Sequence, residues 1–172
     1  MNMTSAENAS IHSYEETPSI ALDQWRLVCD EVMGGQSCGE LDLVLHDKRR
    51  CNQLSGDVST ANNGGFIKIA HDLDREEKFA ASDATGIRLT VKGNNEQYNV
   101  HLQTSDLWLP WQSYRHSFHA AQDWQTLELP FSDFQPCNVD IAFNPKKLSR
   151  ISLVAIGRNF HADLYVNDVS YF

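Results

Sequence analysis

The sequence predicts one all-β domain of the sandwich or barrel class. Polar and apolar residues alternate with a period of two in one short segment after another, which is typical of strands that bury one face. Turn residues separate these segments at intervals of about 8–12 residues, as in sandwiches and barrels. Apolar residues do not show a sustained helical spacing in any window of about a dozen residues. We therefore expect about nine or ten short strands in the 172 residues.

The first half of the chain contains four predicted strands and one short helix. The strands cover residues 20–28, 40–45, 54–59 and 65–70. Asn-Asn-Gly precedes the last of these, and this composition suits positive φ angles in a tight connection. After that strand, the polar stretch contains Glu, Arg and Lys, which are good helix formers and favour a short helix at 74–79.

The second half of the chain contains six further predicted strands. Residues 86–92 form the clearest one, because their apolar and polar side chains alternate without interruption and would face opposite sides of a sheet. Proline cannot donate a hydrogen bond to a neighbouring strand, so Pro130 is expected to end the fourth of the six, residues 124–129. Residues 98–103 alternate in the same way, and the remaining predicted strands cover residues 114–119, 124–129, 148–156 and 162–172.

The charge of the chain argues against several classes of partner. The 14 basic and 23 acidic residues give a net charge of −9. Nucleic acids and anionic membranes both require clustered Lys and Arg. No segment approaches the roughly 20 apolar residues of a spanning helix, and the N-terminus matches neither a signal peptide nor a transit peptide. We therefore expect a cytoplasmic protein without membrane insertion, with a polar tail at residues 1–19 and a single domain at residues 20–172.

Metal and catalytic motifs are not found in the sequence. The cysteines form no Cys-x-x-Cys pair, and free thiols are expected in a cytoplasmic protein. His116 and His119 would point to opposite faces of one strand. No GxSxG elbow occurs, so we expect a non-catalytic protein without a metal or cofactor. A calcium site in the loops stays open, since such sites need only oxygen ligands such as those of Asp30, Asp57, Asn62, Asn167 and Asp168.

A glycine-rich loop follows the first predicted strand, with the sequence Asp30-Glu31-Val32-Met33-Gly34-Gly35-Gln36-Ser37. Paired glycines allow positive φ angles and a close approach of the backbone. One interpretation is a nest of backbone N–H groups that binds a ligand together with Asp30. The other is a structural turn in which Asp30 accepts hydrogen bonds from nearby amides. We expect the structural role, with Asp30 and Ser37 anchoring the loop and Gly34 and Gly35 shaping its backbone.

Two further features are candidate ligand sites. Polar side chains of the middle strands would line one sheet face if those strands adjoin, and such a face suits a carbohydrate or a peptide. Trp108, Trp111 and Tyr114 could form a stacking platform or a protein-binding hot spot. The alternatives are a solvated sheet face and packing at the edge of the core. The candidate ligand-binding residues are Arg88, Asn99, His101, Gln103, Trp111, Tyr114 and Arg115.

Taken in order, these segments resemble the complex I intermediate-associated protein family. The resemblance begins near Trp25 and extends to the end of the chain. Its signature residues are Asp30, Met33, Gly34, Gly35, Ser37, Gly65 and Phe66, and Glu31 stands where many relatives have glycine. Further matching segments are Leu54–Ser59, Gly86-Ile87, Val91-Lys92-Gly93, Tyr98, Tyr114–Phe118, Trp124-Gln125, Leu129-Pro130-Phe131, Asp133-Phe134 and Asn167-Asp168-Val169.

The resemblance implies a galactose-binding-like jelly-roll β-sandwich, similar to some carbohydrate-binding modules. It also implies a non-catalytic, chaperone-like protein that binds a protein partner, with respiratory complex I subunits as the expected partners. A carbohydrate-binding domain that holds a glycan on its concave sheet face is the alternative. An enzyme that acts on a sugar or a small acid is a third hypothesis.

Overall fold

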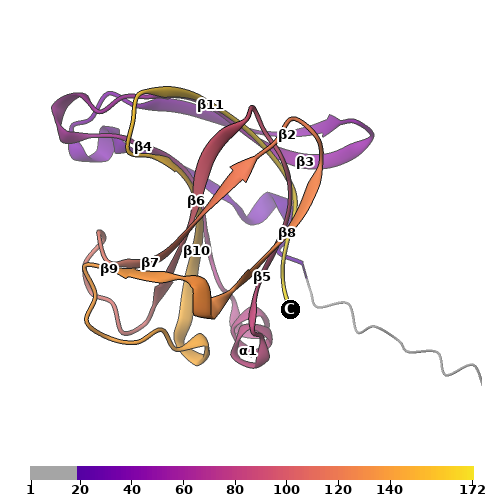
Figure 1. Cartoon of the computed structure of the whole chain (residues 1–172), viewed down its shortest axis with the longest axis vertical. Helices are drawn as coiled ribbons and strands as arrows, with labels where there is room; N and C mark the ends of the chain where they lie inside the picture. The colour runs from indigo at the N-terminus through magenta and orange to yellow at the C-terminus, as the bar shows by residue number, and fades with distance from the viewer. Residues whose placement is uncertain (1–18) are drawn as a thin grey trace, which may run out of the picture.

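The computed structural model describes residues 19–172, without the side chains of Val32, Met33 and Asn63. The predicted tail therefore lies outside the described residues, apart from Ser19. Within these described residues, eleven strands form two sheets (Figure 1). The strands are β1 (Arg26–Cys29), β2 (Cys38–His46), β3 (Arg49–Val58), β4 (Phe66–Asp72), β5 (Gly86–Lys92), β6 (Glu96–Thr104), β7 (Ser113–Ala120), β8 (Gln125–Pro130), β9 (Gln135–Cys137), β10 (Leu148–Ile156) and β11 (Phe160–Tyr171).

The two sheets stack as a β-sandwich, which confirms the predicted fold class. Sheet A has the strand order β1-β4-β10-β6-β7-β9, and sheet B has the order β2-β3-β11-β5-β8. All neighbouring strands are antiparallel. In Figure 1 the labels of sheet A lie mainly at the centre and left, and those of sheet B along the top and right.

The core lies between the inward faces of the two sheets. Alternation along β6 turns Tyr98, Val100 and Leu102 inward, where they are fully buried. Leu89 of β5 and Leu164 of β11 meet them from sheet B and are also fully buried. Each such side chain contributes about 1.5–3 kcal/mol through burial. The polar residues between them on β6 consequently point away from the core.

Two connections differ from the sequence prediction. Strand β3 begins at Arg49, because its polar first half pairs with β2 along a long hairpin. The tight connection expected at residues 62–64 joins the two sheets, since β3 belongs to sheet B and β4 to sheet A. Asn62 and Gly65 adopt positive φ angles of 56° and 137° in this crossing. Strand β9 was not predicted, because three residues around Pro136 carry no alternation signal.

The helix predicted near residues 74–79 is present as α1, Arg75–Asp83. Asp74 caps it by accepting a hydrogen bond from the N–H of Glu77, while the Glu77 carboxylate accepts one from the N–H of Asp74. Five short 3₁₀ turns complete the list: Leu22–Gln24, Asp30–Met33, Ala61–Asn63, Phe131–Asp133 and Pro145–Lys147. Within the described part of the chain, no helix has both the length and the apolar character needed to cross a membrane.

Candidate functional site

The outward face of sheet A brings together four of the predicted ligand residues. Asn99, His101 and Gln103 alternate with core residues on β6 and therefore share this face. Arg115 on β7 lies opposite His101. The same row continues across the sheet through Ser152 of β10. We call the outward-pointing residues of these strands the outer face of sheet A: Arg26, Val28, Lys68, Ala70, Asp72, Asn99, His101, Gln103, Arg115, Ser117, Arg150, Ser152 and Val154.

Arg88 is not part of this face, contrary to the expectation that it adjoins the other polar residues. It lies on β5 in sheet B, opposite Glu128 of β8. Its guanidinium pairs with that carboxylate at 2.9 Å. Consecutive strands β5 and β6 have the same alternation but enter different sheets. The alternation of a single strand does not specify its partner strand, so this separation could not be predicted from the sequence.

Tyr114 is a core residue, and this corrects its expected place in an exposed aromatic cluster. It is 1 % exposed, and its hydroxyl donates a hydrogen bond to the carbonyl of Ile141 at 2.6 Å. Its ring packs edge-on against Phe143. Trp108 and Trp111 are instead 90 % and 54 % exposed. The aromatic cluster is therefore divided, because Tyr114, the second residue of β7, points inward to the core.

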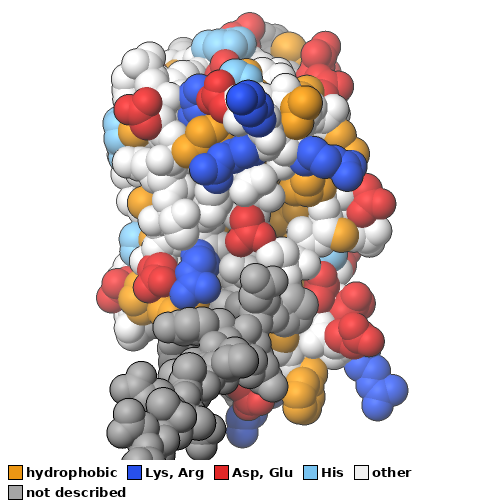
Figure 2. Space-filling view, turned by 90° about the vertical axis from the view of Figure 1, so that its right-hand side faces the viewer, with side chains coloured by type: hydrophobic (Ala, Val, Ile, Leu, Met, Phe, Trp, Pro, Cys, Tyr) orange, Lys and Arg blue, Asp and Glu red, His pale blue; other side chains and the backbone are white. Residues whose placement is uncertain are grey.

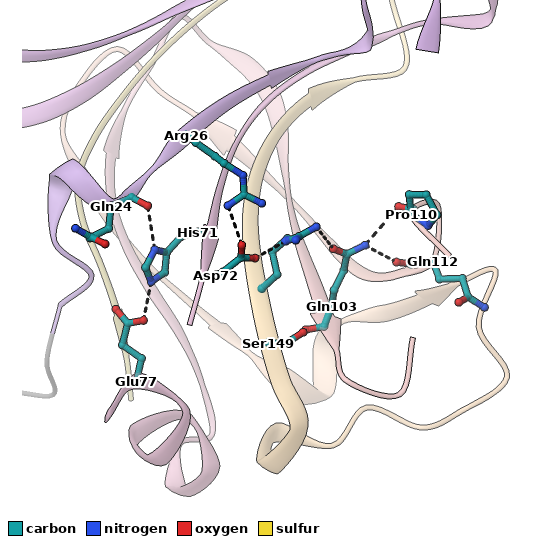
Figure 3. Close-up of polar contacts among 10 residues, drawn as sticks. Gln24, Arg26, His71, Asp72, Glu77, Gln103, Pro110, Gln112 and Ser149 are labelled. Atoms are coloured by element: carbon teal, nitrogen blue, oxygen red, sulfur yellow. Dashed lines mark hydrogen bonds and ion pairs between the residues drawn. The ribbon is translucent and has the colours of Figure 1, made fainter. Parts of the chain in front are cut away.

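Trp111 lies in a loop that is fastened to the outer face. This tryptophan loop, residues 105–112, joins β6 to β7. The amide nitrogen of Gln103 donates to the carbonyls of Gln112 at 3.0 Å and Pro110 at 3.4 Å (Figure 3). An open hollow of about 330 Å³ lies beside it, lined by Gln103, Thr104, Leu107, Trp108, Leu109, Pro110, Ser149 and Arg150. The loop therefore forms a rim with both polar and apolar surface.

A charged network crosses the outer face from β1 to β6. The carboxylate of Asp72 pairs with Arg26 at 3.0 Å and with Arg150 at 2.6 Å. Arg150 also donates to the side-chain oxygen of Gln103 at 3.4 Å. Figure 3 shows this chain of contacts running towards the tryptophan loop. Burial alone would raise the pKa of Asp72, but hydrogen bonds and charge from Arg150 and Arg26 lower it overall.

His101 is a nearly buried polar group on this face. It is 8 % exposed, and its Nε2 has no hydrogen-bond partner in the described part of the chain. Burial lowers the pKa of His101 to about 3, and the charges of Arg115 and Lys68 act in the same direction. The imidazole is therefore neutral near pH 7. A buried polar atom without a partner carries a desolvation cost that a ligand atom can remove.

Lys68 and Arg115 are the two cations of this face that no carboxylate in residues 19–172 neutralises. Burial lowers the pKa of Lys68, and the positive charges of Arg150, Arg26 and Arg115 lower it further. The ammonium of Lys68 lies 5.4 Å from the centre of the Phe66 ring. The Nε of Arg115 donates to the hydroxyl of Ser113 at 2.8 Å. Both charges remain available to a ligand.

Apart from Arg115, sequence reasoning missed the residues that give this face its charge. Lys68 stands between Ile67 and Ile69 in a strand that was predicted, and Arg150 and Asp72 also lie in or beside predicted strands. Their place at polar positions next to apolar ones was a usable signal that these side chains point away from the core. What the sequence did not contain was the order β1-β4-β10-β6-β7, which brings these strands beside the residues of β6 and β7.

A second polar cluster joins α1 to sheet A, away from the outer face. His71 points inward from β4 and is 4 % exposed. Its Nε2 lies 2.6 Å from the carboxylate of Glu77, and its Nδ1 lies 3.1 Å from the carbonyl of Gln24 (Figure 3). The same Glu77 carboxylate caps the helix. This cluster fixes the position of α1.

The signature loop is built around the buried carboxylate of Asp30. One oxygen accepts from the N–H of Ser37, and the other accepts from the N–H groups of Gly65 and Phe66. The Ser37 hydroxyl donates to the carbonyl of Ser59. Gly34 adopts a φ of 83°, in the left-handed region. The side chain of Met33, which was also expected in this loop, lies outside the described residues.

No metal cluster is found among the described residues. Within residues 19–172, no three His, Cys, Asp or Glu side chains gather closely enough to hold a metal ion. The carboxylate oxygens of Asp30 already accept three backbone N–H groups. The four cysteines are free thiols, and Cys51 is fully buried.

One family accounts for nearly the whole sequence. The sequence model of complex I intermediate-associated protein 30 matches residues 12–165. The chain belongs to this family. The comparison of this family member with curated proteins finds no match. The resemblance seen in the sequence is thereby confirmed.

Solved structures of carbohydrate-binding modules share the fold of this complex I intermediate-associated protein 30 family member. One is a family 11 module from Clostridium thermocellum, in complex with a β-1,3-1,4-mixed-linked tetrasaccharide. Its sequence is 12 % identical, its TM-score is 0.70, and the match covers 90 % of this chain and 94 % of the module. The family 11 module of the cellulosomal cellulase Lic26A-Cel5E from the same organism has 13 % identity and a TM-score of 0.67, covering 91 % and 95 %. A family 30 module of a cellulosomal cellulase from that organism has 11 % identity and a TM-score of 0.55, covering 80 % and 90 %. These similarities agree with the predicted jelly-roll sandwich.

Proposed function

We propose that this chain is a non-catalytic binding domain that holds a protein partner on the outer face of sheet A during the assembly of respiratory complex I. The observation that carries the proposal is the combination of His101, with its unpartnered Nε2, and the two cations without a carboxylate, Lys68 and Arg115. Polar groups that are desolvated but unpaired lower the stability of the free protein, and a ligand that pairs them recovers this free energy on binding. Membership of the family supports the choice of respiratory subunits as partners.

The tryptophan loop fits the rim of such a site. Trp108 and Trp111 expose large rings beside the polar face. Aromatic side chains are enriched among the residues that dominate protein–protein affinity. The hydrogen bonds from Gln103 hold the loop against the outer face, so little ordering of the loop is needed on binding. A partner can therefore engage the polar face and the rim together.

A pull-down from the native host tests the assembly role. The tagged wild-type chain is compared with Arg115→Gln on the outer face and with Arg88→Gln on sheet B, a matched control at a half-buried arginine. We expect the wild type and Arg88→Gln to recover complex I subunits and Arg115→Gln to recover far less. The assembly role would be refuted if neither the wild type nor Arg88→Gln recovered these subunits and a deletion strain had normal levels of complex I.

A carbohydrate ligand is the second candidate function. The observation that favours it is the shared fold with a family 11 module solved with a mixed-linked tetrasaccharide. Exposed rings such as that of Trp111 stack well on sugars. Titration with that tetrasaccharide, using the wild type and Trp111→Ala, tests this function. Binding that Trp111→Ala abolishes would support it, and no binding in a glycan array would count against it.

A further inference from the structure

The two outer surfaces of the sandwich carry opposite charge. The outer face of sheet A has four cations, one on each of β1, β4, β7 and β10, and the single carboxylate of Asp72. The outward positions of sheet B instead carry six carboxylates (Glu40, Asp42, Asp57, Glu128, Asp163 and Asp168) against the three cations Arg49, Arg88 and Lys92. Figure 2, seen from the right-hand side of Figure 1, shows acidic and basic side chains interspersed over that side. In a chain with a net charge of −9, a locally cationic face is a distinct feature.

The single carboxylate of the outer face is already engaged. Asp72 divides its two oxygens between Arg26 and Arg150. Lys68 on β4 and Arg115 on β7 are left without a carboxylate in the part of the chain that the structure describes. Three strand spacings, about 15 Å, separate their strands across the sheet. Arg115 shares its row with His101 and Ser152, and Lys68 lies in the adjacent row of the same face with Val154 and Asn99. The charges of both cations act on the His101 ring.

Mutual repulsion of these cations disfavours the free state. The pKa of Lys68 is lowered by burial and by three arginines, which means that its ammonium is less stable here than in water. Neutral His101 adds no further charge to the cluster. An anionic group placed above His101 would remove the repulsion and interact with both cations. A neutral ligand such as an uncharged sugar would leave the repulsion unchanged.

We propose that the outer face of sheet A binds an acidic peptide segment, with a side-chain carboxylate seated between Lys68 and Arg115 above the imidazole of His101. Carboxylate is favoured because a guanidinium and an ammonium can both donate to its two oxygens. A peptide is chosen because the inference rests on the proposed function, in which the partner is a protein. The electrostatic complementarity sets the orientation and the specificity of the segment.

The hollow beside the tryptophan loop extends this site. Leu107, Trp108 and Leu109 line it together with Arg150 of the charged network. Its volume of about 330 Å³ lies within the range of small ligand pockets. Since Gln103 links the hollow to the outer face, one short segment can reach both. We therefore expect the bound segment to carry a bulky apolar side chain next to its acidic residue.

Two capped heptapeptides test the proposal, GSEWESG and its uncharged counterpart GSQWQSG. Their affinities for the full chain are measured by calorimetry, with chemical shifts of the His101 ring as a local readout. We expect the acidic peptide to bind and the uncharged one to bind about tenfold more weakly or not at all, since one half-buried ion pair corresponds to about that factor. Affinity should fall as salt is raised.

Variants locate the site. Lys68→Gln and Arg115→Gln should each weaken the acidic peptide by about tenfold, whereas Arg88→Gln on sheet B should change its affinity less than about twofold. Thermal unfolding of each variant shows that it is folded. Equal binding of the two peptides, no binding of either, or unchanged binding by Arg115→Gln would overturn the proposal.

The results also separate this inference from the proposed function. Capture of complex I subunits without any preference for the acidic peptide would leave the assembly role standing and reject the anionic ligand. Binding of the acidic peptide at Lys68 and Arg115, with no capture of those subunits, would support the anionic site and reject the assembly role. An oligogalacturonate that binds this face while the acidic peptide does not would overturn the assignment to a peptide.

Discussion

The carboxylate of Asp30 accepts a hydrogen bond from the backbone N–H of Gly65, 35 positions further along the chain, at 2.5 Å. It also accepts from the N–H groups of Ser37 and Phe66. One fully buried side chain thus joins the two ends of the loop between β1 and β2 to each other and to the start of β4. The signature residues of the family therefore lie at a junction between the two sheets.

Replacing Asp30 with Asn should destabilise the fold. The amide keeps the shape of the carboxylate, but its NH₂ group would face backbone donors and leave buried N–H groups unpaired. We expect a loss of about 3 kcal/mol in the free energy of unfolding, since hydrogen bonds to a buried charge are each worth about 1.5–3 kcal/mol. Urea denaturation measures this loss. Wild-type stability combined with lost partner binding would instead assign Asp30 to ligand contact.

Stability should decrease in acid because of the same carboxylate. Burial would raise the pKa of Asp30, but hydrogen bonds from Ser37, Gly65 and Phe66 lower it overall. Its contribution is therefore complete above the unfolded-state pKa of about 3.9 and is lost as the pH falls through the lower folded-state pKa. Denaturation curves from pH 6 to pH 2 should fall less steeply for Asp30→Asn than for the wild type. Parallel curves would contradict this origin of the acid sensitivity.

The two glycines of the signature loop should tolerate alanine to different extents. A Cβ at Gly35 would lie 2.4 Å from Cγ of the buried Asp30 carboxylate, whereas a Cβ at Gly34 meets nothing within 4 Å. Gly35→Ala should cost about 3 kcal/mol through this clash. Gly34→Ala should cost about 1 kcal/mol, because its φ of 83° strains a side chain. Equal losses in thermal unfolding would contradict the steric explanation.

Glu77→Ala should loosen α1 without affecting the outer face of sheet A. The carboxylate contacts His71 at 2.6 Å and the N–H of Asp74 at 2.9 Å. Its loss should cost about 1–2 kcal/mol, as expected for a cap and a buried hydrogen bond. Glu76→Ala, an exposed position on the same helix, is the matched control. Hydrogen exchange of the α1 amides would show whether the destabilisation is local, and equal protection in the two variants would speak against it.

Tyr114→Phe and Trp111→Ala should have opposite effects. The first removes the hydrogen bond to Ile141 but keeps the core ring, so stability should fall by about 1 kcal/mol with partner binding unchanged. The second removes an exposed ring, so stability should stay within about 0.5 kcal/mol while binding weakens. If Tyr114→Phe lost binding without losing stability, Tyr114 would instead be assigned to ligand contact.

Local patterns were sufficient to predict most strands and the helix. Alternation along β5 and β6 identified which side chains of each strand face the core, because successive side chains must point to opposite sides. The charged first turn of α1 was visible in the sequence for the same local reason. The weakest predictions lay where local pattern is absent, as at β9.

The sequence by itself determined the fold class, the family and, for strands with clear alternation such as β5 and β6, which side chains point inward and which outward. Only the tertiary structure decided that Arg88 faces away from Asn99, that Tyr114 is buried, and that Lys68 lies on the same face as Arg115. Side-chain direction within a strand is fixed by local backbone geometry. The neighbours of a strand are instead chosen by pairing between distant segments, which depends on how the whole core packs.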